Sequence, residues 1–456
     1  MELLARRAAS LQVQEAALRA EFEDWRKRTE KQEKLEKHNT QVRRITAQLE
    51  AFLDGLPREA APSFAGLEKS YTRVLGAHRI WAFFRSKLAL RDVAWLLDDL
   101  TTADELAWAC YQPVREKAKA AGQIKPEALK EPPLLFFSSQ PAPFVQGRET
   151  NFQPEGVTSD DTSKFGRAVL KLPVPVIGLP WFHVDHLPIA ALVAHEVGHA
   201  VERDFGLEDQ LGSLFDNLSV DAQRRSAWKM WRKEIFADVF GIVCTGRASV
   251  LALMDYLIND PMKIQQQRAD GPAWGLYPPD FLRMLLNVEV LSQLAPTGCG
   301  REAWLDAYSR PIEEAWRGAY LFHQMTAFEP EIAAVVGAIL TAKWEGLGGA
   351  TLAEAVPPVN EERVGKLADD ILKRKALPTN EPFRQLFAAA TVAYHQDTAG
   401  YVASNQTVSV AARLFQLIPA GVRSGDRQLS QAEQQKQQQA DRQAGAALLA
   451  FFDEEV

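Results

Sequence analysis

Two histidines and a glutamate occupy a spacing that is suited to binding a metal ion. His195, Glu196 and His199 belong to the sequence His-Glu-Val-Gly-His. Residues four apart on a helix differ by about 40° around its axis, so both imidazoles project from one face and can bind one ion. Glu196 lies beside them, where it can hydrogen-bond a water on the metal. The flanks, from Ala190 to Val201, are apolar, and burying such polar groups there is costly unless something pairs with them.

A catalytic zinc ion needs a third protein ligand and keeps one coordination position open. One zincin pattern takes this ligand from a histidine six residues after the second, but Phe205 stands there. Glu234 and Asp238, in another apolar segment, are again four residues apart, and their carboxylates would repel each other unless a cation stabilised them. We therefore predict that Glu234 is the third ligand and that Asp238 accepts the free N–H of a ligand histidine.

These five residues resemble the pattern of the gluzincin metallopeptidases, which combine an HExxH helix with a later helix that carries Glu-x-x-x-Asp. The resemblance covers roughly residues 165–245. It implies a zincin-like catalytic core that contains a small β-sheet and binds Zn²⁺. It also implies an edge strand ahead of the HExxH helix that aligns a peptide, and we expect this strand at 168–179.

The resemblance implies an enzyme that hydrolyses peptide bonds in a protein or peptide substrate. Zinc would lower the pKa of a bound water, and Glu196 would accept its proton as general base and deliver it to the leaving amine. A donor to the oxyanion of the tetrahedral intermediate is also expected. Tyr277, in a Tyr-Pro-Pro-Asp turn, is our candidate, and His323 and His395 are the alternatives.

Two other hypotheses remain open at this point. The protein could be a non-catalytic helical scaffold or interaction protein with a structural zinc site, although such a site gains little from a carboxylate like Glu196 beside its ligands. It could also be a latent enzyme, in which flanking helical regions cover the cleft until a partner or a processing event opens it. The large share of the chain outside the predicted site motivates the latent form.

Residues 1–54 have the pattern of a long helical or coiled-coil arm. Large apolar side chains recur every seven residues in two phases, and the polar stretch 26–34 separates the phases, so we expect a bend or hairpin there. Such helices can pack on the protein's own body, or they can form a dimer or dock a partner. The repeat consists of Leu4, Leu11, Leu18 and Trp25, and then Leu35, Val42 and Leu49.

The rest of the chain is mostly helical by its hydrophobic periodicity. The proline-rich segment 131–144 indicates a connection between two units, and the glutamine-rich stretch 431–443 is expected to be a solvated helix or a tail. The expected helices span about 67–122, 186–201, 227–257 and most of 281–450.

The predicted fold class is mainly α, with a zincin-like core that contains a small β-sheet and with helical regions before and after it. We divide the chain into the N-terminal arm at 1–54, a helical region at 55–134, the metallopeptidase core at 135–290 and a C-terminal helical region at 291–456.

Composition argues against several classes of protein. The formal net charge is −7 and no stretch concentrates Lys and Arg without interleaved Asp or Glu, so the sequence gives little support to a nucleic-acid surface, which normally needs a basic patch. Three distant cysteines, Cys110, Cys244 and Cys299, do not fit a disulfide framework and favour a reducing compartment. The amino terminus has no apolar signal segment, and no apolar run is long enough to cross a bilayer. We therefore expect a soluble, cytoplasmic protein.

Overall fold

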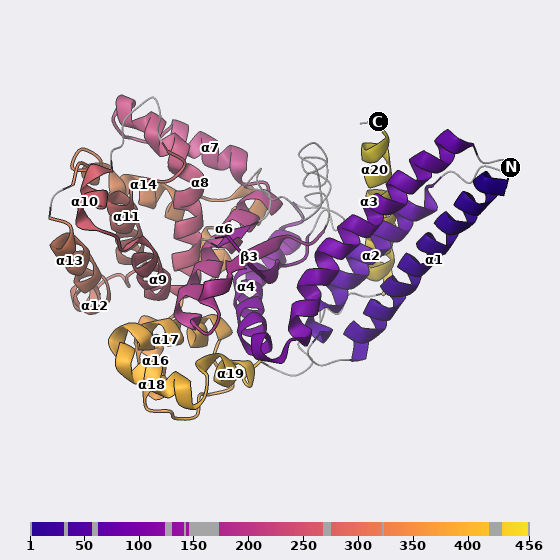
Figure 1. Ribbon diagram of the computed structural model, residues 1–456. Helices are drawn as coiled ribbons and strands as arrows, with labels where there is room; N and C mark the ends of the chain where they lie inside the picture. Colours follow the sequence, from indigo (N-terminus) through magenta and orange to yellow (C-terminus); the bar gives the residue numbers. More distant parts are fainter. Residues whose placement is uncertain are drawn as a thin grey trace.

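The computed structural model describes residues 2–31, 35–56, 63–123, 130–140, 143–145, 173–267, 275–321, 323–418 and 431–454. These residues form a mainly helical protein with one small sheet, which confirms the coarse fold class (Figure 1). None of the described helices is long and apolar enough to cross a membrane.

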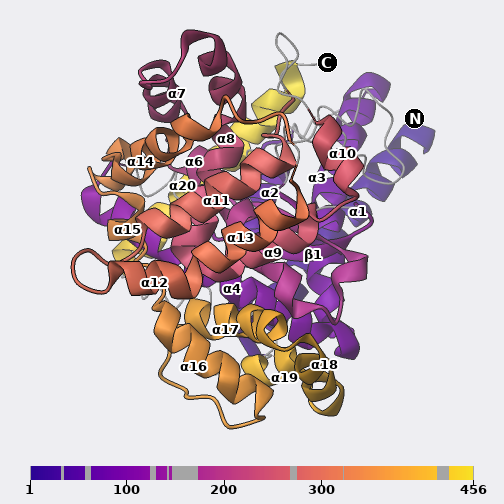
Figure 2. The same cartoon turned by 90° about the vertical axis from the view of Figure 1, so that its left-hand side faces the viewer.

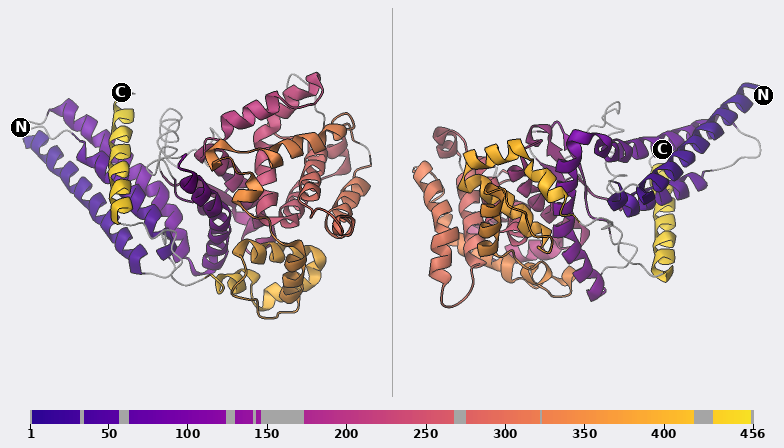
Figure 3. Two further views of the ribbon diagram at one scale, coloured as in Figure 1. Left: turned by 180° about the vertical axis from the view of Figure 1, so that it is seen from behind. Right: turned by 90° about the horizontal axis from the view of Figure 1, so that it is seen from below.

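Four helices form a group on one side of the molecule, which we call the N-terminal bundle. They are α1 (Glu2–Lys31), α2 (Asn39–Asp54), α3 (Phe64–Ala89) and α20 (Gln431–Glu454), as Figures 1 and 3 show. Helix α1 ends at Lys31, inside the polar stretch 26–34 where we expected a bend, and α1 and α2 both pack on the protein's own body. Residues 32–34 lie outside the described residues. Trp81 of α3 packs edge-on against Phe22 of α1 in the shared core.

For the glutamine-rich segment we expected either a solvated helix or a tail. It is helical, but it is not fully solvated. Its helix α20 packs along α2, and Ala440, Asp441 and Leu448 are buried there. Asp441 Oδ1 accepts a hydrogen bond of 3.0 Å from Gln48 and one of 3.3 Å from Arg44. The sequence pattern did not reveal this partner because α2 lies far away along the chain.

All other helices gather in a larger part with its own hydrophobic core. In Figure 2, which faces this part, the helices α16 to α19 lie together at the lower end. Its helices in sequence order are α4 (Ala94–Ala121), α6 (Val193–Asp204), α7 (Glu208–Asp216), α8 (Ala222–Thr245), α9 (Arg247–Leu257), α10 (Pro261–Gln266), α11 (Asp280–Gln293), α12 (Arg301–Tyr308), α13 (Arg310–Ala319), α14 (Ile332–Thr341), α15 (Leu352–Ala355), α16 (Glu361–Leu372), α17 (Phe383–Gln396), α18 (Thr398–Thr407) and α19 (Val410–Phe415).

Short 3-10 helices connect several of these elements. They are η1 (Glu36–His38), η2 (Leu90–Asp92), η3 (Trp181–His183), η4 (Leu187–Leu192), η5 (Glu329–Glu331) and η6 (Glu345–Leu347). The predicted helix at 186–201 therefore begins as the 3-10 helix η4 and continues as α6. The predicted helical stretch 227–257 is divided into α8 and α9 at Gly246, whose φ of +61° lies in the region that glycine adopts most readily.

The sheet has three strands in the order β1-β3-β2, where β1 is Leu134–Ser138, β2 is Phe144–Val145 and β3 is Val176–Pro180. Strand β3 pairs in parallel with β1 and antiparallel with β2. We expected an edge strand at 168–179, but the strand found there, β3, is the central one, so this prediction is wrong. Residues 168–172 lie outside the described residues. Pro173 and Pro175, which suggested an edge, precede the strand and remove no donor from its ladder.

A buried polar network joins the N-terminal bundle to this sheet. Arg91 of η2 donates to Asp104 of α4 at 2.6 Å and to the carbonyl oxygen of Leu135 in β1 at 2.8 Å. The second carboxylate oxygen of Asp104 accepts the Leu135 N–H at 3.2 Å, and His38 of η1 lies 3.3 Å from the first. Because all of these side chains are buried, each one depends on the others for its hydrogen bonds.

Two glycines allow α6 and α8 to pack closely against each other. A Cβ on Gly198 of α6 would lie 2.9 Å from Ala237 Cα and 3.1 Å from Ala237 O in α8. In return, a Cβ on Gly241 of α8 would lie 3.2 Å from the backbone nitrogen of His195 in α6. Side chains larger than hydrogen at these positions would force the helices apart.

The substitution Gly198→Ala is expected to destabilise the protein by about 1–3 kcal/mol, because its methyl group has no space against the α8 backbone. Urea unfolding followed by circular dichroism measures this change. The matched control is Gly212→Ala in α7, where a Cβ meets nothing within 4 Å and the better helix former is expected to add up to about 1 kcal/mol. Unchanged stability in Gly198→Ala would contradict the close contact.

Candidate metal centre

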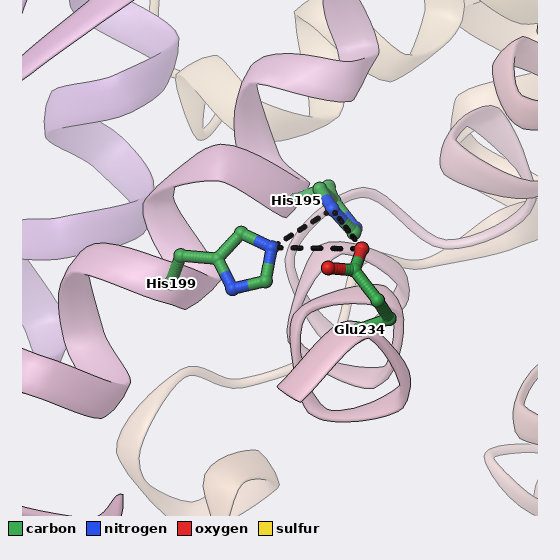
Figure 4. A group of neighbouring side chains, drawn as sticks. All are labelled: His195, His199 and Glu234. Carbon is green, nitrogen blue, oxygen red and sulfur yellow. Dashed lines mark hydrogen bonds and ion pairs between the residues drawn. The ribbon is translucent and has the colours of Figure 1, made fainter. Parts of the chain in front are cut away.

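Helices α6 and α8 bring His195, His199 and Glu234 together in the interior of the larger part (Figure 4). The Nε2 atoms of the two histidines lie 3.1 Å apart, and Glu234 Oε2 lies 3.5 Å from the first and 3.8 Å from the second. All three side chains are buried. The structure thus places the predicted ligands from two separate helices within reach of one point.

These separations fit the ligand set of a tetrahedral zinc ion. With bonds of about 2.0–2.1 Å, two ligand atoms on such an ion lie roughly 3.3 Å apart, and the three observed distances scatter around that value. Two imidazoles and a carboxylate are also a donor set that zinc takes in catalytic sites. Among the described residues, this is the one group of His, Cys, Asp and Glu whose donor atoms lie close enough together to hold an ion.

Asp238 lies next to His195, one of the two histidines predicted to bind the metal. Its Oδ1 is 2.6 Å from His195 Nδ1, so the carboxylate is in position to accept the Nδ1–H of the ring. A proton held on Nδ1 leaves the Nε2 lone pair of His195 free, on the side where Glu234 and His199 converge.

Helix α11 supplies two partners of Asp238 that the sequence reading missed. Arg283 donates from Nε to Asp238 Oδ2 and from Nη2 to Oδ1, each at 2.8 Å, and Asn287 Nδ2 donates to Oδ2 at 3.0 Å. Burial alone would raise the pKa of the Asp238 carboxyl, but the charge and the hydrogen bonds of Arg283 hold this pKa well below its usual value. A buried arginine in an apolar helix was the one signal in the sequence that could have pointed to such a partner.

Glu196 lies beside the ligands, with its Oε1 4.0 Å from His195 Nε2. The side chain is buried, and its Oε2 has no hydrogen-bond partner among the described residues. A buried carboxylate oxygen in this position is costly unless water or a substrate group occupies the space next to it.

The formal charges of the centre match a divalent cation. Ionised Glu196, Glu234 and Asp238 carry three negative charges, Arg283 carries one positive charge, and the neutral imidazoles add none. The sum is −2, so a doubly charged ion brings the buried group to neutrality. Because an uncompensated buried charge is costly, this balance favours a divalent metal over a monovalent ion.

Two tyrosines flank Arg283 at the surface. Tyr277, the predicted oxyanion donor, is 47% exposed, and its ring centroid lies 5.6 Å from Arg283 Cζ. Tyr256, at the end of α9, is 43% exposed and was not foreseen. Burial raises the pKa of Tyr256; the positive charge of Arg283 opposes this rise, and the negative charges of Asp280 and Glu196 add to it.

The alternative donors His323 and His395 have other partners. The His323 ring stacks on Phe281 with centroids 3.7 Å apart, and His395 Nε2 lies 3.1 Å from Asp255. Tyr256 could not be foreseen because its place in the molecule depends on how α9 packs after the turn at Gly246.

No family model, curated protein or solved structure matches this chain. The chemistry of the centre is therefore inferred from its own residues.

We expect the purified protein to bind one zinc ion per chain and Glu234→Ala to lose it. Loss of a residue that only orients a ligand weakens metal binding by up to about 100-fold. Removal of a direct ligand is expected to weaken zinc binding by more than that. Metal analysis after dialysis measures the stoichiometry. Glu196→Gln is the matched control, since it changes a neighbouring carboxylate and is expected to keep the metal. Stoichiometric zinc in Glu234→Ala would refute this ligand set.

Proposed function

We propose that the protein is a zinc-dependent metallopeptidase of the gluzincin type, which hydrolyses peptide bonds in a protein or peptide substrate. The observation that supports this most directly is the convergence of His195, His199 and Glu234 with Glu196 beside them. When bound, zinc supplies a Lewis acid that polarises a carbonyl group and makes water acidic enough to lose a proton near neutral pH.

The roles of the side chains follow from their positions. His195, His199 and Glu234 hold the metal, and Asp238 keeps the His195 ring in the orientation that exposes Nε2. One carboxylate oxygen of Glu196 lies 4.0 Å from His195 Nε2, and the other has no hydrogen-bond partner among the described residues, so the side chain can accept a proton from water as general base. The same carboxyl then carries that proton to the leaving amine.

The alternative function is a helical scaffold with a structural zinc site. Burial of all three metal donors fits such a site as well as a catalytic one. Glu196 favours the enzyme, because a structural site is closed by a fourth protein ligand and has no use for a nearby base. The same burial fits a latent peptidase that a partner or a processing event opens.

Glu196→Gln is expected to lower kcat by about 10²–10⁴-fold, because glutamine cannot accept the proton, while zinc content stays at one per chain. Cleavage of a peptide library, followed by mass spectrometry, measures turnover. The matched control is Glu202→Gln, the same change six residues further along α6 on another face of the helix, which is expected to keep activity. Wild-type turnover in Glu196→Gln would exclude the general-base role.

Tyr277→Phe is expected to lower kcat by about 10²–10³-fold if this phenol donates to the oxyanion, with KM and zinc content nearly unchanged. Tyr256→Phe is the matched comparison, since both tyrosines are similarly exposed and flank Arg283. Steady-state kinetics on one cleaved peptide distinguish the two. A loss confined to Tyr256→Phe would transfer the role to that residue.

A further inference from the structure

Helix α11 carries two buried polar residues that lie beside the candidate metal centre but are not among its predicted ligands. Arg283 is 5% exposed and Asn287 is 2% exposed, and most of their neighbours on α11 are buried apolar side chains. The two residues are four apart, so they share one face of the helix. Burying a guanidinium in such a helix is costly and needs a compensating partner.

That partner is Asp238, whose two oxygens are fully engaged. Oδ1 lies 2.6 Å from His195 Nδ1 and accepts from Arg283 Nη2 at 2.8 Å. Oδ2 accepts from Arg283 Nε at 2.8 Å and from Asn287 Nδ2 at 3.0 Å. The asparagine amide also donates to the Arg283 carbonyl oxygen at 2.9 Å, which fixes the two donors relative to each other. These contacts favour the observed orientation of the carboxylate.

We propose that Arg283 and Asn287 are a positioning pair that holds Asp238, and through it His195, in the metal-binding orientation before the ion arrives. This inference rests on the proposed metal centre. A rotation of the His195 ring would break its contact with Asp238, and a rotation of Asp238 would break three hydrogen bonds from α11. The bidentate fork is specific to arginine, since a lysine ammonium cannot donate in parallel to both oxygens.

Arg283 also compensates the negative charges that the site concentrates on α8. Glu234 and Asp238 are four apart on this helix, and Arg283 Nη2 lies 3.7 Å from Glu234 Oε2 as well as 2.8 Å from Asp238. A guanidinium between two carboxylates reduces their repulsion whether or not a metal is bound. The centre is thus preorganised, and removing the metal with a chelator should leave the protein folded.

The test compares Arg283→Lys, which keeps the charge but loses the fork, and Asn287→Leu, which removes one neutral donor at similar volume. The matched control is Arg384→Lys in α17, a buried arginine that donates to the backbone oxygens of Cys244 at the end of α8 and of Pro357. Zinc affinity is measured by competition with a chromophoric chelator, and coordination geometry by the visible spectrum of the Co²⁺-loaded protein.

Arg283→Lys is expected to weaken zinc binding by about 10–100-fold and to change the Co²⁺ spectrum, with a smaller loss in Asn287→Leu and neither effect in Arg384→Lys. Wild-type affinity and spectrum in Arg283→Lys would overturn the positioning role, even if that variant were less stable. Should Arg283→Lys fail to fold, Asn287→Leu decides by the same two readings. If the wild type binds neither Zn²⁺ nor Co²⁺, the proposed metal centre itself is refuted. That outcome is distinct from a failure of the positioning role alone.

Discussion

The close contact between α6 and α8 is the constraint on which the candidate site depends. Gly198 lies against Ala237, which stands between Glu234 and Asp238, and Gly241 lies against the backbone of His195. Each glycine is therefore close to a predicted metal ligand, either along its own helix or across the contact between the two helices. Since the donors are separated by only 3.1–3.8 Å, a displacement of the helices by the size of a methyl group would separate the imidazoles from the carboxylate.

A third helix, α11, completes the site that α6 and α8 form. Helix α11 contributes no metal donor, yet it provides the one positive charge in the group and the hydrogen bonds that orient Asp238. The site is thereby built as a series of contacts: side chains of α11 donate to Asp238 of α8, Asp238 lies against His195 of α6, and His195 faces the other two predicted metal ligands. Every member is buried, so water cannot replace a missing partner and each contact is more demanding than it would be at the surface.

The sequence was sufficient for those parts of the site that local spacing determines. Residues four apart on a helix share a face wherever that helix lies, so the pairs His195–His199 and Glu234–Asp238 could be read directly. Arg283, Asn287 and Tyr256 could not, because their relation to the site depends on how α9 and α11 pack in space. For the same reason the helices of the arm were predicted, whereas the central place of β3 and the packing of α20 on α2 were not.

The burial of α20 against α2 also affects how the chain must fold. Arg44 and its partner Asp441 are 397 positions apart, and Leu448 shares a core with Leu18 and Leu49. During synthesis the first helices leave the ribosome long before the helix that covers them is made. The part of α2 that α20 covers therefore stays exposed while the larger part is translated, and this core is completed late, by a helix far away along the chain.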